Sequence, residues 1–97
     1  METFVRDTIT LVLYIGKNLI GFDNLKIKYK DPEGETGQWD AAVTPTDALS
    51  MQAQLGSQLS IAGTWKIQAY AESADGTERF HGMWTELKVY TPLHVVD

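Results

Sequence analysis

Hydrophobic and polar residues alternate with a period of two along several stretches of the chain, most clearly in Gly63–Tyr70. The apolar positions of that stretch are Trp65, Ile67 and Ala69. Shorter stretches at Trp39–Val43 and Leu49–Ala53 repeat the alternation. A period of two is typical of a β-strand with one face on a hydrophobic core. Strong helical periodicity is absent, and the one short segment with near-helical spacing, Gln54–Ala62, is expected to be a connector.

The pattern and the turn residues together predict six or seven short strands. The predicted strands are Thr8–Ile15, Leu25–Lys30, Gln38–Thr44, Ala48–Gln54 and Thr64–Glu72, followed by a final run that Gly82 breaks or bulges into pieces around Arg79–His81 and Thr85–Tyr90. Asp31–Gly34 matches a type I turn, and Asp75-Gly76 marks a hairpin. Strands at this spacing predict an all-β, two-sheet sandwich, with a small barrel as the alternative.

The length and composition fit one small domain. The 97 residues form a single unit, with a core at about 8–92 and a tail at 93–97 that is flexible or docks elsewhere. No cysteine is present, which excludes disulfides and thiolate chemistry. The first residues lack the pattern of a signal peptide, and Leu11–Phe22 is too short and too polar to span a bilayer. We therefore expect a soluble protein with no signal peptide and no membrane insertion.

Charge argues against nucleic acid as a partner. The formal net charge is −5, and only eight Lys and Arg are present. Binding a phosphate backbone depends on neutralising its charge, so we expect no nucleic-acid binding. Lys26, Lys28 and Lys30 do form a row on one strand face. The row either contacts an anionic partner or protects an edge strand from pairing, and the second interpretation is favoured.

The sequence contains no constellation of catalytic or metal-binding residues. His81 and His94 lie far apart and have no acidic cluster at metal-ligand spacing. The serines lie in no strand–turn–helix elbow, and the loop carboxylates show no calcium-binding spacing. We expect no enzyme activity, no catalytic residue, no metal site and no cofactor.

The aromatic residues serve the core or a binding surface. Trp39 and Trp65 share the parity of apolar neighbours, which places both indoles in the core. Trp84 follows Gly82 near the predicted break, so the alternation does not determine on which face of the sheet its side chain lies. Exposed aromatic rings would suit a sugar, and a carbohydrate- or host-surface-binding module is therefore an alternative function.

The segment Thr8–Ile15 is apolar on both faces, which is unusual for a strand of a two-sheet sandwich. Val12 and Tyr14 occupy the face opposite the core. That face is covered either by another chain or by the following connection folding back. The residues predicted at a protein interface are Val12, Tyr14, Leu19, Ile20, Phe22 and Trp84.

Five segments in a fixed order resemble a known class of module. They are Asn24–Tyr29, Lys30–Gly34, Gln38–Ala41, Gly63–Tyr70 and Val89–Pro92. Together they resemble the small immunoglobulin-like β-sandwich modules of tailed-bacteriophage and prophage structural proteins, of the baseplate or fibre-anchoring type. The chain departs from the usual module in its apolar connection Ile15–Phe22.

The resemblance implies a non-catalytic structural role in a phage or prophage particle. It implies binding to other virion proteins, to further copies of this chain, or to both. The expected location is the virion, or the host cytoplasm during assembly. The resemblance supplies no active-site residues.

Overall fold

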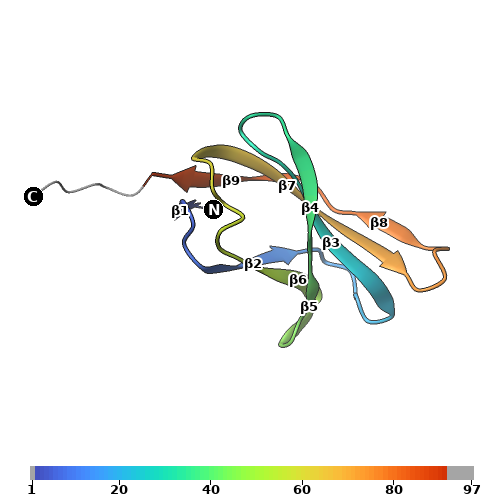
Figure 1. Cartoon of the computed structure of the whole chain (residues 1–97). Helices are drawn as coiled ribbons and strands as arrows, with labels where there is room; N and C mark the ends of the chain where they lie inside the picture. Colours follow the sequence, from blue (N-terminus) through green and yellow to red (C-terminus); the bar gives the residue numbers. More distant parts are fainter. Residues whose placement is uncertain (1, 92–97) are drawn as a thin grey trace, which may run out of the picture.

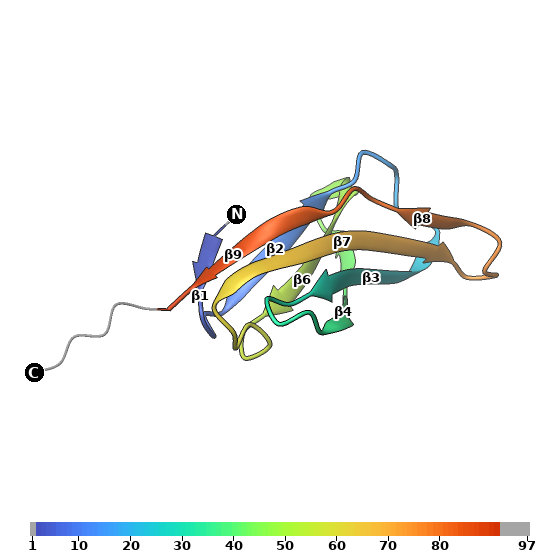
Figure 2. The ribbon, with the colours of Figure 1, turned by 90° about the horizontal axis from the view of Figure 1, so that it is seen from above.

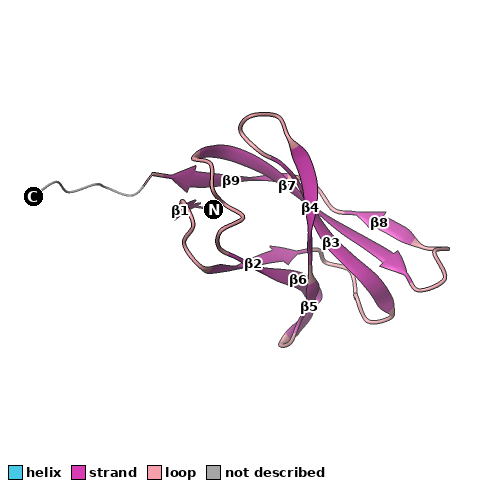
Figure 3. Cartoon of the chain, in the orientation of Figure 1, coloured by secondary structure: helices cyan, strands magenta, loops and turns pink. Residues whose placement is uncertain are grey.

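The computed structural model describes residues 2–91, and these residues fold into two packed β-sheets without a helix (Figures 1 and 3). The strands are β1 (Glu2–Phe4), β2 (Ile9–Tyr14), β3 (Phe22–Lys30), β4 (Thr36–Asp40), β5 (Ala42–Thr44), β6 (Asp47–Leu55), β7 (Gly63–Ser73), β8 (Arg79–His81) and β9 (Thr85–Tyr90). This arrangement confirms the predicted all-β sandwich. The predicted tail at 93–97 lies outside the described residues.

The two sheets differ in size. Sheet A has the order β1-β9-β7-β3-β4, with β8 also paired to β7, and sheet B has the order β2-β6-β5. Neighbouring strands are antiparallel except β1 and β9, which are parallel. Figure 2 shows β9, β7 and β3 of sheet A lying over β2 and β6 of sheet B.

The predicted strand Gln38–Thr44 is two strands that belong to different sheets. β4 pairs with β3 in sheet A, and β5 pairs with β6 in sheet B. Ala41 lies between them, and its N–H donates to the carbonyl of Leu25 (3.0 Å). The alternation of Trp39, Ala41 and Val43 continues through the crossing, because both sheets face the same core. Figure 1 shows this segment passing from one layer to the other.

Strand β1 extends the sandwich beyond the predicted core boundary at residue 8. Its inward residue is Thr3, which is buried, whereas Phe4 is exposed. The inward residue is polar and one of the two outward residues is a large apolar one, so β1 lacks the alternation that predicts a strand. β1 is held by its parallel pairing with β9, and the N–H of Val5 donates to the carbonyl of Tyr90 (2.8 Å).

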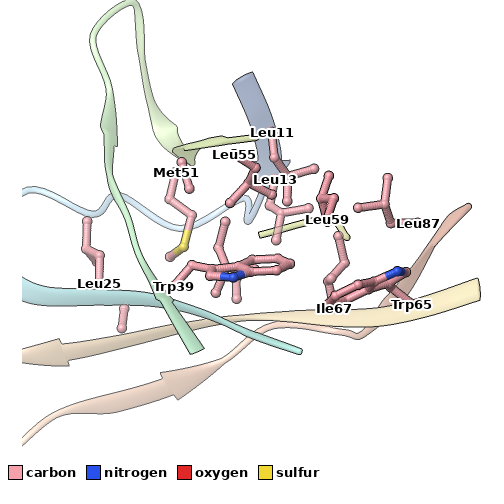
Figure 4. Close-up of a cluster of buried hydrophobic side chains, with 14 of the residues drawn as sticks. Leu11, Leu13, Leu25, Trp39, Met51, Leu55, Leu59, Trp65, Ile67 and Leu87 are labelled. Carbon is pink, nitrogen blue, oxygen red and sulfur yellow. The ribbon is translucent and has the colours of Figure 1, made fainter. Parts of the chain in front are cut away.

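Both predicted core tryptophans are buried: Trp39 is 9% exposed and Trp65 is 3% exposed (Figure 4). Tyr29 stacks on Trp39 with ring centroids 4.4 Å apart and lies 5.4 Å from Trp65. The indole N–H of Trp65 donates to the carbonyl of Ile61 (2.9 Å), so this polar group is buried with a hydrogen-bond partner. Aliphatic side chains of β2, β3, β6, β7 and β9 fill the rest of the core, together with Leu19 and Leu59 from the connections.

Candidate functional site

The structure separates the six residues predicted at an interface. Val12, Tyr14, Ile20 and Trp84 are exposed, and Phe22 is half-buried. Leu19 is fully buried, so the prediction that its side chain forms part of an exposed interface is wrong. The connection from β2 to β3 folds Leu19 into the core, and its N–H donates to the carbonyl of Ala48 (2.9 Å). The outer face of β2 remains uncovered, with Val12 43% and Tyr14 65% exposed.

Strand β2 forms one edge of sheet B. The N–H of Ile15 donates to the carbonyl of Leu49 on the β6 side (2.8 Å). Because successive residues of an antiparallel strand direct their backbone groups to opposite sides, those of Thr10, Val12 and Tyr14 point away from β6. Among residues 2–91 no other strand pairs with this side of β2, so the strand presents an unpaired row of backbone donors and acceptors.

The outer face of sheet B carries no charge along β2 and along β6 from Ala48 onward. The register places Thr10 beside Gln54 and Val12 beside Gln52. Natural edge strands usually carry a charge, a proline or a bulge that prevents pairing with another chain. Ile9–Tyr14 contains no charged residue and no proline, and its pairing with β6 is uninterrupted.

A groove of about 540 Å³ lies beside the end of β2, on the flank of the sandwich. One wall is formed by Val12, Tyr14 and Ile15, and the other by Phe80 and Met83. Met83 is 94% exposed. An added strand beside β2 would therefore meet apolar side chains as well as backbone groups.

Trp84 belongs to a different surface, the outer face of sheet A. Between the pairs Tyr70↔His81 and Ile67↔Thr85, three residues of the β8–β9 segment oppose two residues of β7. This bulge confirms the predicted interruption at Gly82, whose N–H donates to the carbonyl of Ala69 (2.9 Å). It leaves Trp84 57% exposed, with the ammonium of Lys66 4.9 Å from the indole centroid.

The row Lys26, Lys28 and Lys30 does not protect an edge, and the favoured interpretation of it is wrong. β3 lies between β4 and β7 in the interior of sheet A, so both of its sides are paired. Lys26 forms an ion pair with Asp40. Lys28 places its Nζ 4.4 Å from the centroid of the Tyr70 ring and 3.4 Å from His81 Nε2.

The carboxylates of the turns organise the backbone around them. Asp31 accepts from the N–H groups of Glu33 and Glu35, each at 2.9 Å. Asp75 accepts hydrogen bonds from Ser73 and Thr77, which lower the pKa of its carboxyl to about 2. Among residues 2–91, no group of three or more His, Asp or Glu side chains is placed to hold a metal ion.

One carboxylate pairs with a tyrosine and an arginine at the far end of β7. The hydroxyl of Tyr70 donates to Glu72 Oε2 (2.5 Å), and this bond raises the pKa of Tyr70. Arg79 Nε lies 3.2 Å from the same oxygen. The Tyr70–Glu72 bond is part-buried and lies within β7, whereas the ion pair of Arg79 with Glu72 joins β7 to β8.

The chain matches no protein-family model and no curated protein. Within the part of the chain that the structure describes, no helix has the length and apolar character needed to cross a bilayer. The surfaces from which a function can be inferred are the edge of β2 and the outer face of sheet A.

Sequence reasoning did not identify Lys66 or the backbone groups of Thr10 as parts of these surfaces. The alternation of Trp65 and Ile67 already placed Lys66 on the outer face. The alternation does not reveal the register of β3 and β7, which sets Lys66 directly beside Lys30.

Proposed function

We propose that this chain is a non-catalytic structural module of a phage or prophage particle, and that it assembles by pairing strand β2 with β2 of a second copy. The observation that carries the assembly proposal is the unprotected, uncharged edge of β2. The assignment to a particle rests on the resemblance of the ordered sequence segments. It makes the virion, or the host cytoplasm during assembly, the expected location, with other virion proteins as further partners.

A two-fold antiparallel arrangement satisfies the chemistry of this edge. Residues directly opposite in an antiparallel pair point to the same side of the sheet. The register that pairs Val12 with Val12 of the second copy therefore sets Leu11 beside Leu13 on the inner face. On the outer face it sets Thr10 beside Tyr14, an aromatic and β-branched pair of the kind that stabilises sheets. The free backbone groups of Thr10, Val12 and Tyr14 then form about six hydrogen bonds across the interface.

Charge is compatible with this register. Each copy carries a net charge of −5, but the paired segment itself is uncharged. The same register brings Asp7 of one copy to the end of the interface where Lys17 of the other lies, because both are five residues from Val12. Repulsion between more distant charges is screened beyond about 8 Å at physiological ionic strength. Isologous pairing of this kind also gives a closed, symmetric dimer.

Sedimentation of the wild type and two matched variants tests the pairing. Val12→Glu places two like charges directly opposite each other across the two-fold axis, whereas Gln52→Glu adds the same charge to the same face but on the central strand β6. We expect the wild type to sediment at twice the 10.8 kDa chain mass. Val12→Glu should weaken the dimer at least about tenfold, the effect of 1.4 kcal/mol, and Gln52→Glu should leave it intact.

A wild type that stays monomeric at about 1 mM, where even a weak pair of about 4 kcal/mol is half-formed, would contradict self-association. Equal dimerisation of Val12→Glu and the wild type would contradict the β2 register. The particle assignment has a separate test. The chain should co-purify with tailed particles on a density gradient, and recovery only in particle-free fractions would contradict it.

A carbohydrate- or host-surface-binding role is the second candidate function. The exposure of Trp84 favours it. This role would use sheet A, whereas assembly would use sheet B, so one chain could perform both.

A further inference from the structure

The outer face of sheet A carries a groove whose side chains suit an anionic sugar. The groove has a volume of about 640 Å³, and its lining includes Lys28, Lys30, Lys66, Gln38, Gln68 and Trp84. No carboxylate is among the residues that line it. In a chain with 13 acidic and 8 basic residues, this is a local reversal of charge.

The charges around the lysines of the groove are only partly balanced. Lys30 and Lys66 are direct cross-strand neighbours on β3 and β7, and like charges in such positions destabilise a sheet. The other cross-strand neighbour of Lys66 is the acidic Glu86 on β9. Within residues 2–91, no carboxylate lies within 4.0 Å of the ammonium groups of Lys28, Lys30 or Lys66. The ammonium groups of Lys28 and Lys66 instead lie near the rings of Tyr70 and Trp84. An anionic ligand would relieve the repulsion between Lys30 and Lys66, because Glu86 neighbours Lys66 but not Lys30.

The neutral side chains of the groove provide hydrogen bonds of both kinds. The amide nitrogen of Gln68 donates to the carbonyl of Gly82 (2.9 Å), which fixes this side chain and leaves its amide oxygen as an acceptor. Gln38 lies across β3 on the same face, because both glutamines are register partners of Lys28. Amide groups in these positions match the hydroxyl groups of a pyranose ring.

Trp84 supplies a flat surface at the edge of the groove. Its indole stands between this groove and a second hollow of about 540 Å³ that includes Glu86 and Lys88. The face of an aromatic ring suits the apolar face of a sugar. The ammonium of Lys66 now lies over this ring, and a ligand carboxylate or sulfate that binds Lys66 would draw the ammonium away and expose the indole.

We propose that this groove binds a short acidic oligosaccharide, with Lys30 and Lys66 on its carboxylate or sulfate groups, Gln38 and Gln68 on its hydroxyls and Trp84 against a ring face. The proposal rests on the carbohydrate-binding candidate described above and does not depend on assembly through β2, because the two surfaces belong to different sheets.

Other anionic partners fit the groove less well. A peptide adds to a sheet through unpaired backbone groups, but β3 and β7 are paired on both sides here. Protein interfaces also have an apolar core, and Trp84 is the only large hydrophobic side chain of the groove that is exposed. Single-stranded nucleic acid needs several aromatic rings on which successive bases stack.

Tryptophan fluorescence and calorimetry on the full chain test the proposal. Trp39 and Trp65 are buried, so Trp84 should report binding. The probes are oligogalacturonate for carboxylates and a chondroitin sulfate oligosaccharide for sulfates. A cello-oligosaccharide is the neutral control, and polyglutamate and oligothymidylate represent peptides and nucleic acids.

We expect saturable binding of at least one acidic saccharide with a change in Trp84 emission. Binding should disappear in about 1 M salt, where the screening length falls to about 3 Å. Lys30→Gln, Lys66→Gln and Trp84→Ala should each weaken binding about tenfold or more, as expected for loss of a charged hydrogen bond or of ring contact. Lys26→Gln is the matched control, because Lys26 faces outward from the same strand but is paired with Asp40, and its affinity should be unchanged.

Three results would overturn the proposal. The first is the absence of saturable binding by both acidic saccharides at millimolar concentration. The second is equal affinity of Lys26→Gln, Lys30→Gln and Lys66→Gln. The third is binding of polyglutamate, oligothymidylate or the neutral saccharide as tight as that of the acidic ones. Carboxylate and sulfate ligands are distinguished by which of the two acidic probes binds more tightly.

Discussion

Replacing Gly37 by alanine should destabilise the sandwich measurably. Gly37 lies on β4 directly beside Tyr29, and a Cβ at this position would lie 2.6 Å from Cζ and 2.9 Å from Cε2 of the tyrosine ring. The ring cannot move freely, because it stacks on Trp39 and contacts Trp65. The methyl group would therefore push Tyr29 out of the aromatic cluster or bend β4.

The expected loss follows from two opposing terms. Overpacking of a well-packed core costs about 1–3 kcal/mol, and the lower unfolded-state entropy of alanine returns about 0.4–1 kcal/mol. A net loss of about 1–2 kcal/mol remains, which lowers the Tm of a domain of this size by about 4–16 °C. Thermal unfolding followed by circular dichroism measures this shift.

Two further variants make the Gly37 prediction specific. Gly56→Ala is the matched control, because its Cβ would meet only Thr8 Oγ1 at an ordinary 3.7 Å, and its Tm should stay equal or rise. In a Tyr29→Phe background, which removes the hydroxyl nearest to the new methyl group, Gly37→Ala should cost less than in the wild type. A Tm for Gly37→Ala equal to that of the wild type would refute the packing argument.

Two predictions concern the connection after β2 and the hairpin after β7. Leu19→Ala should lower the free energy of unfolding by about 2–5 kcal/mol in urea titrations, because Leu19 is fully buried. Ile20→Ala should change it by less than about 0.5 kcal/mol, because Ile20 is 73% exposed. Equal effects of the two substitutions would contradict the placement of Leu19 in the core. The ionised carboxylate of Asp75, with its pKa lowered from 3.8 to about 2, stabilises the folded state above pH 3.8 and loses this effect as the pH falls toward about 2. The Tm difference between the wild type and Asp75→Asn should therefore be constant above about pH 5 and close between about pH 4 and 2, and a difference that does not change over that range would contradict the hydrogen bonds to Asp75.

The sequence was sufficient to predict most strands and the inward side of each. Alternation of large apolar residues with polar ones marks a half-buried strand whatever its neighbours are, so Trp39, Trp65 and Ile67 could be placed in the core. The same alternation does not say which sheet a strand joins. The segment around Ala41 was therefore predicted to be one strand, although it crosses from sheet A to sheet B.

Neighbour relations were the main information that the sequence lacked. Lys26, Lys28 and Lys30 have the pattern of an edge strand, yet β3 is central, because the pairing partners are set by contacts far apart in the chain. Conversely, β2 is an edge strand of sheet B, although it has no charge, proline or bulge that would protect an edge. Its two-sided apolar pattern predicted an apolar outer face, and Val12 is exposed on that face.

Leu19 shows a related limit. An apolar residue in a connection can cover the outside of a strand or enter the core, and its own sequence neighbourhood does not distinguish these cases. The backbone hydrogen bond from Leu19 to Ala48, which lies 29 positions further along the chain, fixes the outcome. Only the three-dimensional pairing of the β2–β3 connection with the start of β6 supplies this contact.

Amide hydrogen exchange as a function of protein concentration tests the proposed assembly most directly. The N–H groups of Thr10, Val12 and Tyr14 should exchange rapidly in dilute solution and become protected as the concentration rises. Those of Leu11 and Leu13, which point toward β6, should be protected throughout. Rapid exchange at Val12 at every concentration would contradict pairing through β2.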